Sequence, residues 1–226
     1  MNRIVVPLLP RPGERIAVDR PGSHHLLRVQ RLARGASVVA TDAGGGRAHC
    51  TLVDVADGLA VLEVVVVLPA RPHVERIVLL GLPRGPAVDE ALTLGTEAGA
   101  TQFRLVRAQR SPPGQLRLDR LDRVLRAAVT QCGRADRPAI EQRRSVADAL
   151  DPLPLHRFVA TPGGGSARRT TEPAVVAVGP EGGWDPDEQQ ALVDAGFIPI
   201  GLGPFILRTP TAVLAALVSL WHASPD

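Results

Sequence analysis

The sequence of 226 residues contains no lysine and no tyrosine. Without lysine there is no P-loop of the usual form, Gly-x-x-x-x-Gly-Lys-Ser/Thr, and this excludes a P-loop nucleotide hydrolase of that kind. No Gly-x-Gly-x-x-Gly opens a helix after a strand, so a standard dinucleotide-binding site is not expected either. All the strong positive charge comes from arginine, which we attribute to composition bias rather than to mechanism.

Cysteine is scarce, with only Cys50 and Cys132 in the chain. Their spacing fits neither a metal ligand set nor a redox pair, so a reduced cytoplasmic setting is the simplest expectation. His24 and His25 lack other ligand types at workable spacing. We therefore expect no metal site.

Long apolar runs are also missing. The most apolar segments, Leu59–Leu68 and Thr211–Trp221, are shorter than the ~20 residues that span a bilayer. Met1–Pro10 has one early arginine and a short apolar run broken by prolines, without a small-residue cleavage pattern. The sequence thus predicts a cytoplasmic protein without a signal peptide or a membrane partner.

The patterns that are present divide the chain into two parts. Valine-rich segments separated by glycine turns predict strands at residues 37–41, 48–55 and 59–67, with one helical piece near His24–Leu32. Pro69-Ala70-Arg71-Pro72 is typical of a linker, because closely spaced prolines stop helices and strands. From Val74 onward strand and helix patterns alternate, which predicts an α/β domain. We expect domains at residues 1–70 and 73–226, and loops at the glycine runs 44–46 and 163–165.

The most informative segment is Gly179-Pro180-Glu181-Gly182-Gly183. It follows the apolar strand pattern Ala174–Val178 and precedes a helix start in which Asp185 can cap, Pro186 suits the first position and Glu188 completes a capping box. Backbone N–H groups of such a glycine-rich turn can hold a carboxylate, a ribose or a phosphate.

A second turn, Leu202–Thr209, follows the strand pattern Phe197–Ile200. The next helix is expected to have Thr209 as its cap and Pro210 in its first turn. Two strand-turn-helix units in succession imply a parallel sheet, whose ligands bind beyond the carboxyl ends of its strands. We therefore expect both turns to line one site.

Positive charge is concentrated between Arg104 and Arg144, a stretch that contains eleven arginines and only four acidic residues. This stretch carries +7 and the rest of the chain −4, an asymmetry that fits a surface in contact with phosphates. Within it, a helix from Arg117 has a narrow apolar stripe (Leu118, Leu121, Leu125, Ala128 and Cys132) opposite Arg120, Arg123 and Arg126. These three arginines form either an ordinary solvated face or a contact for phosphates.

The two turns, in this order and spacing, resemble the signature of the RsmE family of SPOUT methyltransferases. Further matches run along nearly the whole chain in the family's order. They are the segment from His25 to Arg31, the turn Leu82-Pro83-Arg84-Gly85, the segment Thr96–Ala100, the pair Arg110-Ser111, and Gln131-Cys132-Gly133-Arg134 with Pro138.

This resemblance implies a PUA-like β-barrel that contacts RNA, followed by a SPOUT α/β domain with a C-terminal trefoil knot. It also implies a homodimer that uses S-adenosylmethionine to methylate N3 of a uridine in 16S rRNA of the small ribosomal subunit. Carried over by position, the cofactor residues are Ala160, Thr161, Gly179, Pro180, Glu181, Gly182, Gly183, Ile200, Leu202, Gly203, Ile206, Leu207 and Thr209. Because arginine forks suit phosphates and stack on unpaired bases, the expected RNA contacts are Arg28, Arg31, Arg84, Arg110 and Arg134, and the two histidines are either structural or RNA-facing.

For catalysis, Arg208 is expected to stabilise the charge that develops on the uracil as N3 loses its proton, although it could instead only tie down the knot. An arginine cannot be the base, since it stays protonated. The family pattern usually has a basic residue at Phe205 and a glutamate at Pro210, so Glu181 or Asp187 would have to replace that carboxylate. Cys132 lies on the apolar stripe and is expected to be a small core residue rather than a nucleophile.

From the sequence alone, two alternatives remain open. The chain could be a non-catalytic rRNA-binding factor of ribosome assembly whose site degenerated through Phe205 and Pro210. It could also be a methyltransferase that acts on another RNA.

Overall fold

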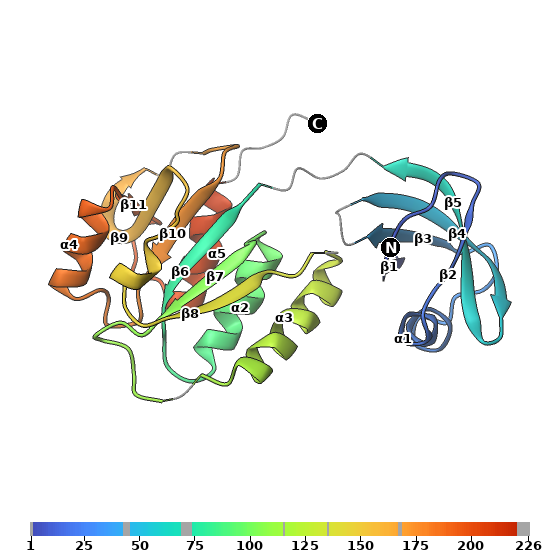
Figure 1. Ribbon diagram of the computed structural model, residues 1–226, viewed down its shortest axis with the longest axis horizontal. Helices are drawn as coiled ribbons and strands as arrows, with labels where there is room; N and C mark the ends of the chain where they lie inside the picture. Colours follow the sequence, from blue (N-terminus) through green and yellow to red (C-terminus); the bar gives the residue numbers. More distant parts are fainter. Residues whose placement is uncertain are drawn as a thin grey trace. The chain divides into compact units, whose positions relative to one another are not determined.

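A computed structural model describes residues 2–42, 46–68, 74–114, 116–134, 136–166 and 169–220. The chain forms two compact units (Figure 1). Unit 1 comprises Met1–His73 with Val129–Asp136, and unit 2 comprises Val74–Ala128 with Arg137–Asp226. The linker expected at residues 69–72 lies outside the described residues. None of the helices in the described ranges is long and apolar enough to cross a bilayer.

Unit 1 contains a five-stranded sheet with the order β1-β3-β4-β5-β2. Apart from the parallel pair β1 and β3, its strands are antiparallel. Alternate side chains are buried along much of β4 and β5, as the valine-rich pattern predicts for a sheet with one covered face, whereas four consecutive residues of β3 are buried. The strands are β1 (Asn2–Val6), β2 (Arg15–Ala17), β3 (Ser37–Asp42), β4 (Arg47–Ala56) and β5 (Leu59–Leu68).

The helical piece of unit 1 starts earlier than the expected His24–Leu32. α1 spans Arg20–His24 and continues into a π-helical turn at His25–Val29. The signal for the earlier start is Asp19, whose carboxylate accepts a hydrogen bond from the N–H of Gly22 at 2.8 Å, followed by a proline in the first turn. Cys50 is buried in this unit, and burial raises the pKa of its thiol, so it is an unreactive core residue.

Unit 2 contains a six-stranded, all-parallel sheet with the order β11-β9-β10-β6-β7-β8. β6 and β10 at its centre are buried on both faces, which explains their unbroken apolar sequences. The strands are β6 (Arg76–Gly81), β7 (Gln102–Val106), β8 (Ala139–Arg143), β9 (His156–Ser166), β10 (Ala174–Val178) and β11 (Ile198–Gly201). The alternation expected from Val74 onward is confirmed.

Helices cover both faces of this sheet (Figure 1). One face packs against side chains of α2 (Ala87–Glu97), α3 (Leu118–Cys132) and α5 (Thr209–Leu220) in a common core. The other face packs against α4 (Pro186–Asp194) and the short 3₁₀ turn Ala147–Ala149. Unit 2 is thus a three-layer α/β structure of the kind in which ligands bind at the carboxyl edge of the sheet.

The glycine run 163–165 is expected from its composition to be a loop, and this expectation is wrong. All three glycines belong to β9, which pairs with β11 through Gly165 opposite Ile200. A Cβ on Gly164 would lie 2.6 Å from the carbonyl carbon of Ile200, so only glycine allows the two backbones to approach this closely. The strand is therefore specified by a close contact with a segment far away in the sequence, which local composition does not reveal.

Two buried arginines stabilise unit 2 from inside. Arg76 in β6 donates from its guanidinium to the carbonyls of Thr170 and Glu172. Arg104 in β7 donates to the carbonyls of Ala149 and Pro152 at 2.8 and 2.7 Å. Burial lowers the pKa of both groups. Each therefore satisfies carbonyl groups of loops that have no partner in the sheet.

Replacing Arg76 with methionine tests this role. The carbonyls of Thr170 and Glu172 lose their donors, and we expect the free energy of unfolding to fall by about 1–3 kcal/mol. Arg137→Met is the matched control, because Arg137 is half-exposed in an ion pair with Asp122 that is worth about 0–1 kcal/mol. Urea unfolding of the two variants measures the difference. Equal losses in both would show that the buried guanidinium adds no stability of its own.

Candidate active site

Three neighbouring strands of unit 2 contribute to one cavity of about 430 Å³, which lies at the ends of β10 and β11 and beside the middle of β9. β9 contributes Ala160 and Thr161, and the turn after β10 contributes Gly179, Pro180, Glu181 and Gly183. The turn after β11 contributes Leu202, Gly203, Ile206, Leu207, Arg208 and Thr209. The structure thus brings the two sequence-predicted turns together at one cavity.

The end of β6 packs against the first turn, Gly179–Gly183. A Cβ on Gly81, the last residue of β6, would lie 2.6 Å from Cδ of Pro180 and 3.0 Å from the ring of Trp184. Glycine at this position therefore lets the turn rest directly on the strand. The Glu181 carboxylate accepts from the N–H of Arg84 at 3.1 and 3.3 Å, which ties the first turn to the segment Leu82–Gly85.

The helix start after the first turn is confirmed. Asp185 accepts from the N–H of Asp187 at 3.1 Å, and Glu188 accepts from the N–H of Asp185 at 2.9 Å. The Asp185 carboxylate also accepts from the N–H of Glu188, and this bond with the return bond from Glu188 forms the capping box expected from the sequence. The second oxygen of Glu188 accepts from the N–H of Gln109 at 2.9 Å, so this helix start also holds the loop after β7.

The second turn has no regular secondary structure, and it is joined to the first by one side chain. The Thr209 hydroxyl donates to the carbonyl of Gly179 at 3.2 Å. The expected role of Thr209 as helix cap is wrong by one position. α5 begins at Thr209, and the carbonyl of Arg208 accepts the first helical bond, from the N–H of Ala212 at 2.8 Å.

Arg208 lies at the rim of the cavity with an accessible guanidinium. Its Nη2 is 3.7 Å from Oε1 of Glu90 in α2, and 76% of its side chain is exposed. An exposed pair at this distance holds the guanidinium only weakly. Arg208 is therefore free to turn toward a bound group. Of the two acids considered as substitutes for the missing glutamate, Glu181 lines the cavity, whereas Asp187 is absent from the cavity lining.

Two of the predicted cofactor residues do not line the cavity. Gly182 is exposed, and its carbonyl accepts from the guanidinium of Arg110 at 2.9 Å. Ile200 is buried in the core. Their backbones shape the two turns, but neither presents a surface to the cavity.

Several wall residues are not among the site residues predicted from the sequence: Pro162, Val178, Trp184, Gln189, Phe205 and Ala212. Trp184 is the most notable, because its side chain is only 8% exposed and its indole N–H has no hydrogen-bond partner among the described residues. A buried donor without a partner is uncommon in proteins. Its position directly after the Gly182-Gly183 pair is the sequence signal that could have identified it.

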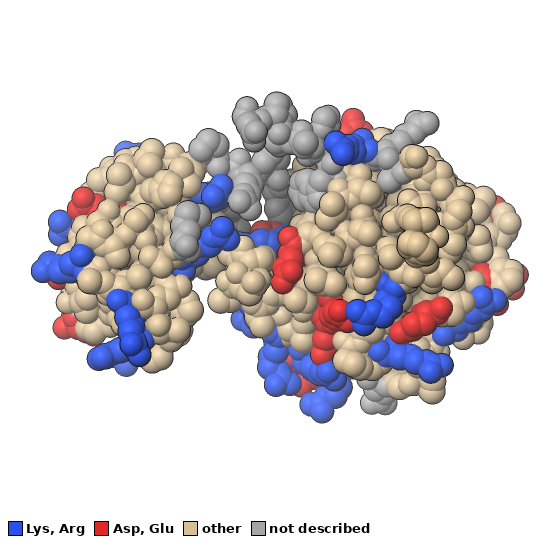
Figure 2. Space-filling model, turned by 180° about the vertical axis from the view of Figure 1, so that it is seen from behind, with Lys and Arg blue, Asp and Glu red and all other residues tan. Residues whose placement is uncertain are grey.

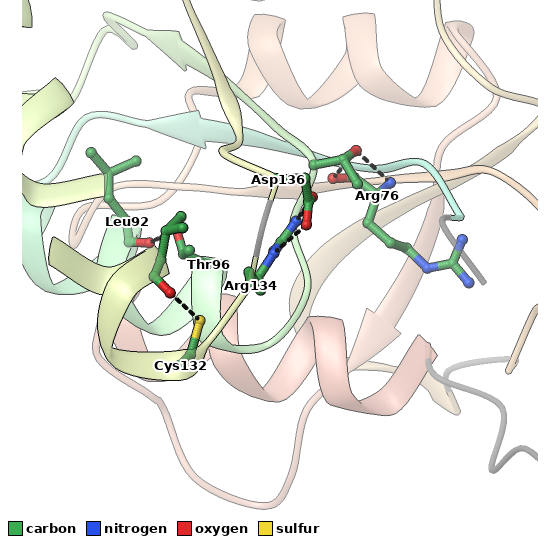
Figure 3. Close-up of polar contacts among 8 residues, drawn as sticks. Arg76, Leu92, Thr96, Cys132, Arg134 and Asp136 are labelled. Carbon is green, nitrogen blue, oxygen red and sulfur yellow. Dashed lines mark hydrogen bonds and ion pairs between the residues drawn. The ribbon is translucent and has the colours of Figure 1, made fainter. Parts of the chain in front are cut away.

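The five arginines expected to contact RNA differ in accessibility. Arg28 and Arg31 are exposed in unit 1, and Arg84 and Arg110 are exposed in unit 2. Arg134 is different, because its side chain is only 14% exposed and forms an ion pair with Asp136 (Figure 3). Of the five, Arg134 is thus the least available to a phosphate.

The charge count of Arg104–Arg144 overstates the free positive charge of this stretch. Arg104 is buried, and the exposed arginines of α3 pair with acids, including one outside the stretch, Asp89 of α2. Figure 2 shows basic and acidic side chains interspersed on one face of the molecule. Exposed ion pairs of this kind are weak, so the arginines remain able to exchange partners.

Cys132 is only half-buried, which corrects the expectation of a core residue, and its thiol points to the carbonyl of Val129 at 3.7 Å (Figure 3). It is not part of the cavity wall. Among the described residues, no three histidine, cysteine, aspartate or glutamate side chains gather as a metal-binding group.

Comparison with known proteins finds a family model described as an RNA methyltransferase domain, which matches residues 70–221. The ribosomal RNA small subunit methyltransferase E of Mycobacterium tuberculosis is 33% identical over 245 residues, covering 97% of this chain and 93% of the relative. That of Synechocystis is 31% identical, covering 87% of this chain and 69% of the relative.

Solved structures agree with these matches. The ribosomal RNA small subunit methyltransferase E of Neisseria gonorrhoeae, bound to S-adenosyl methionine, has a TM-score of 0.79 and 26% identity over 98% of both chains. A methyltransferase of Legionella pneumophila, with 19% identity and a TM-score of 0.76 over 96% of both chains, shares the fold.

The contact between Gly81 and the first turn gives a direct test of the cavity's construction. Gly81→Ala forces Pro180 or Trp184 to move, and we expect a loss of about 1–3 kcal/mol in the free energy of unfolding. Gly165→Ala is the control, since its Cβ would meet its nearest atom only at 3.8 Å. It should change the stability by less than about 1 kcal/mol. A Gly81→Ala variant as stable as the parent would mean that the turn does not rest on β6 as described.

Proposed function

The chain belongs to the ribosomal RNA small subunit methyltransferase E (RsmE) family of RNA methyltransferases, and on this premise we propose that it methylates N3 of a uridine in 16S rRNA. It is an S-adenosylmethionine-dependent methyltransferase of small-subunit rRNA. The observation that carries the assignment of the site is the cavity where both glycine-bearing turns meet, at the ends of β10 and β11 and beside the middle of β9.

The cavity fits S-adenosylmethionine in size and chemistry. Its volume of about 430 Å³ lies within the range of ~300–1,000 Å³ typical of small-molecule sites. Apolar side chains such as Leu202, Leu207 and Ala212 provide a surface for the adenine, and the backbone of the two turns provides donors and acceptors.

When bound, S-adenosylmethionine supplies a methyl group that is already activated by the sulfonium. The protein must then hold the uracil in line and help N3 lose its proton. Arg208 is placed to stabilise the negative charge that spreads onto the neighbouring carbonyl oxygens, because its guanidinium is accessible at the rim. Glu181 is the carboxylate available to accept the proton, and Glu181→Gln tests this role while keeping an acceptor for the N–H of Arg84.

The finer features of the fold are part of this proposal. We assign residues 1–70 to a PUA-like barrel that binds RNA, and residues 73–226 to a SPOUT domain with a trefoil knot. In the sheet, β11 pairs with β9, and β10 pairs with the other side of β9, although β10 precedes β11 in the sequence. A chain path in which a later strand passes an earlier one in this way supports the proposed knot. The RNA contacts proposed are Arg28, Arg31, Arg84 and Arg110, with Arg134 in a lesser role.

A homodimer is also proposed, on the basis of apolar side chains at the cavity rim. Phe205 and Ile206 are 81% and 88% exposed, and a second copy of the chain is a suitable cover for them. This exposure also weighs against a degenerate site, because Phe205 lines the rim of the cavity without blocking it.

Arg208→Ala tests the catalytic role. We expect methyl transfer to fall about 10²–10³-fold, as for the loss of one preorganised donor, with little change in the affinity for S-adenosylmethionine. Arg144→Ala, which removes an exposed arginine outside the cavity, should leave both unchanged. The measurement is single-turnover transfer to small subunits together with calorimetry of cofactor binding. Unchanged transfer rejects the role, and a joint loss of transfer and cofactor affinity indicates that Arg208 only holds the second turn.

The position of the methyl group is tested by mass mapping of 16S rRNA from cells that lack the protein. One N3-methyluridine should be missing, and the purified protein with S-adenosylmethionine should restore it on isolated small subunits. A complete set of N3-methyluridines in those cells would contradict the proposal.

A further inference from the structure

Unit 2 has a second cavity, of about 260 Å³, which the proposed methyl transfer does not use. It lies between the segment Leu82–Gly85, the first turn of α2, the loop after β7 and the first turn of α3. Leucine, valine and proline side chains form part of its wall, together with the three arginines Arg107, Arg117 and Arg120 and one acid, Asp89. The charged groups lining it sum to a positive charge.

The three arginines are held in different ways. Arg107 donates to the carbonyls of Pro112 and Gly114, which are neutral, so its charge is not cancelled. Arg120 pairs with Asp89 at 2.5 Å, and Arg117 pairs with Asp119 at 3.2 Å. Arg117 and Arg120 are 72% and 54% exposed, so both can exchange a carboxylate for a phosphate. α2 and α3 also begin here, and their positive ends favour an anion.

The second cavity adjoins the first through specific contacts. Pro83 and Gly85 line the second cavity, and Arg84 lies between them in the sequence. The backbone N–H of Arg84 donates to the carboxylate of Glu181, which lines the first cavity. Two consecutive acids of α2 contact one arginine of each cavity. Asp89 pairs with Arg120 of the second cavity, and Glu90 lies 3.7 Å from Arg208 of the first. The first turn of α2 therefore connects the arginines of both cavities.

We propose that this second cavity binds one nucleotide of the RNA that flanks the methylated uridine, with its phosphate on Arg117 and Arg120. This inference rests on the proposed function. The guanidinium forks match phosphate geometry, and the leucine and proline surface suits an unstacked base or ribose. The volume lies just below the ~300–1,000 Å³ typical of small-molecule sites, which fits a single nucleotide rather than a second cofactor.

The test compares RNA and cofactor binding by two variants of the full chain. Arg117→Gln with Arg120→Gln removes the charge, and Val88→Phe fills the cavity without changing the charge. Binding of fluorescent 16S rRNA transcript should weaken at least 10-fold for the first variant and at least threefold for the second. In the first variant, the slope of log affinity against log salt should also become shallower by about 0.7–0.9 for each phosphate that the protein no longer neutralises. S-adenosylmethionine affinity by calorimetry should stay within twofold.

Arg123→Gln with Arg126→Gln is the matched control. These arginines lie on the same helix, are 73% and 68% exposed and lie outside the cavity wall. If the control pair weakens RNA binding as much as the cavity pair, or if Val88→Phe binds RNA like the parent, the inference is overturned. Absence of cofactor binding by the parent chain would instead count against the proposed function, and the RNA comparison would still decide this inference.

Discussion

The active site depends on how the Gly179–Gly183 turn is held from three directions. Gly81 lets the turn lie directly on β6, the hydroxyl of Thr209 donates to the carbonyl of Gly179, and the carboxylate of Glu181 accepts from the N–H of Arg84. The first contact fixes the height of the turn above the sheet, and the second brings the start of α5 against it. The cavity is therefore preorganised by contacts that fix the backbone of the turn.

The described arginines of unit 2 contact nearby carbonyl groups and acids and do not form one broad basic surface. Buried arginines such as Arg76 satisfy loop carbonyls inside unit 2, and exposed arginines of α3 pair with nearby acids. Near the two cavities, other arginines form exposed ion pairs whose partners can be exchanged. Arg208 and Arg120, tied to consecutive acids of α2, are the clearest examples. One helix start thus holds two exposed arginines, one in the wall of each cavity, which we propose to act in catalysis and in RNA binding.

Much of unit 2 follows from sequence, because its signals are local. The apolar run 174–178 and the capping box at Asp185 predict a strand and a helix start, and both are observed. The wrong predictions involve contacts between distant segments. Gly164 lies in a strand because it packs on Ile200, and Trp184 joins the cavity wall because the turn before it folds back on Gly81. The observed start of α1 differs from the expected one by a few residues, and that of α5 by one residue. Residue types indicate only approximately the geometry on which capping depends.

The central claim is that the two turns close around one methyl donor. A crystal structure of the protein soaked with S-adenosylmethionine tests it most directly. The account predicts density for the cofactor between residues 179–183 and 202–209, with the methyl group facing the rim where Arg208 lies. Density for the cofactor at any other place, with this cavity empty, would contradict the account.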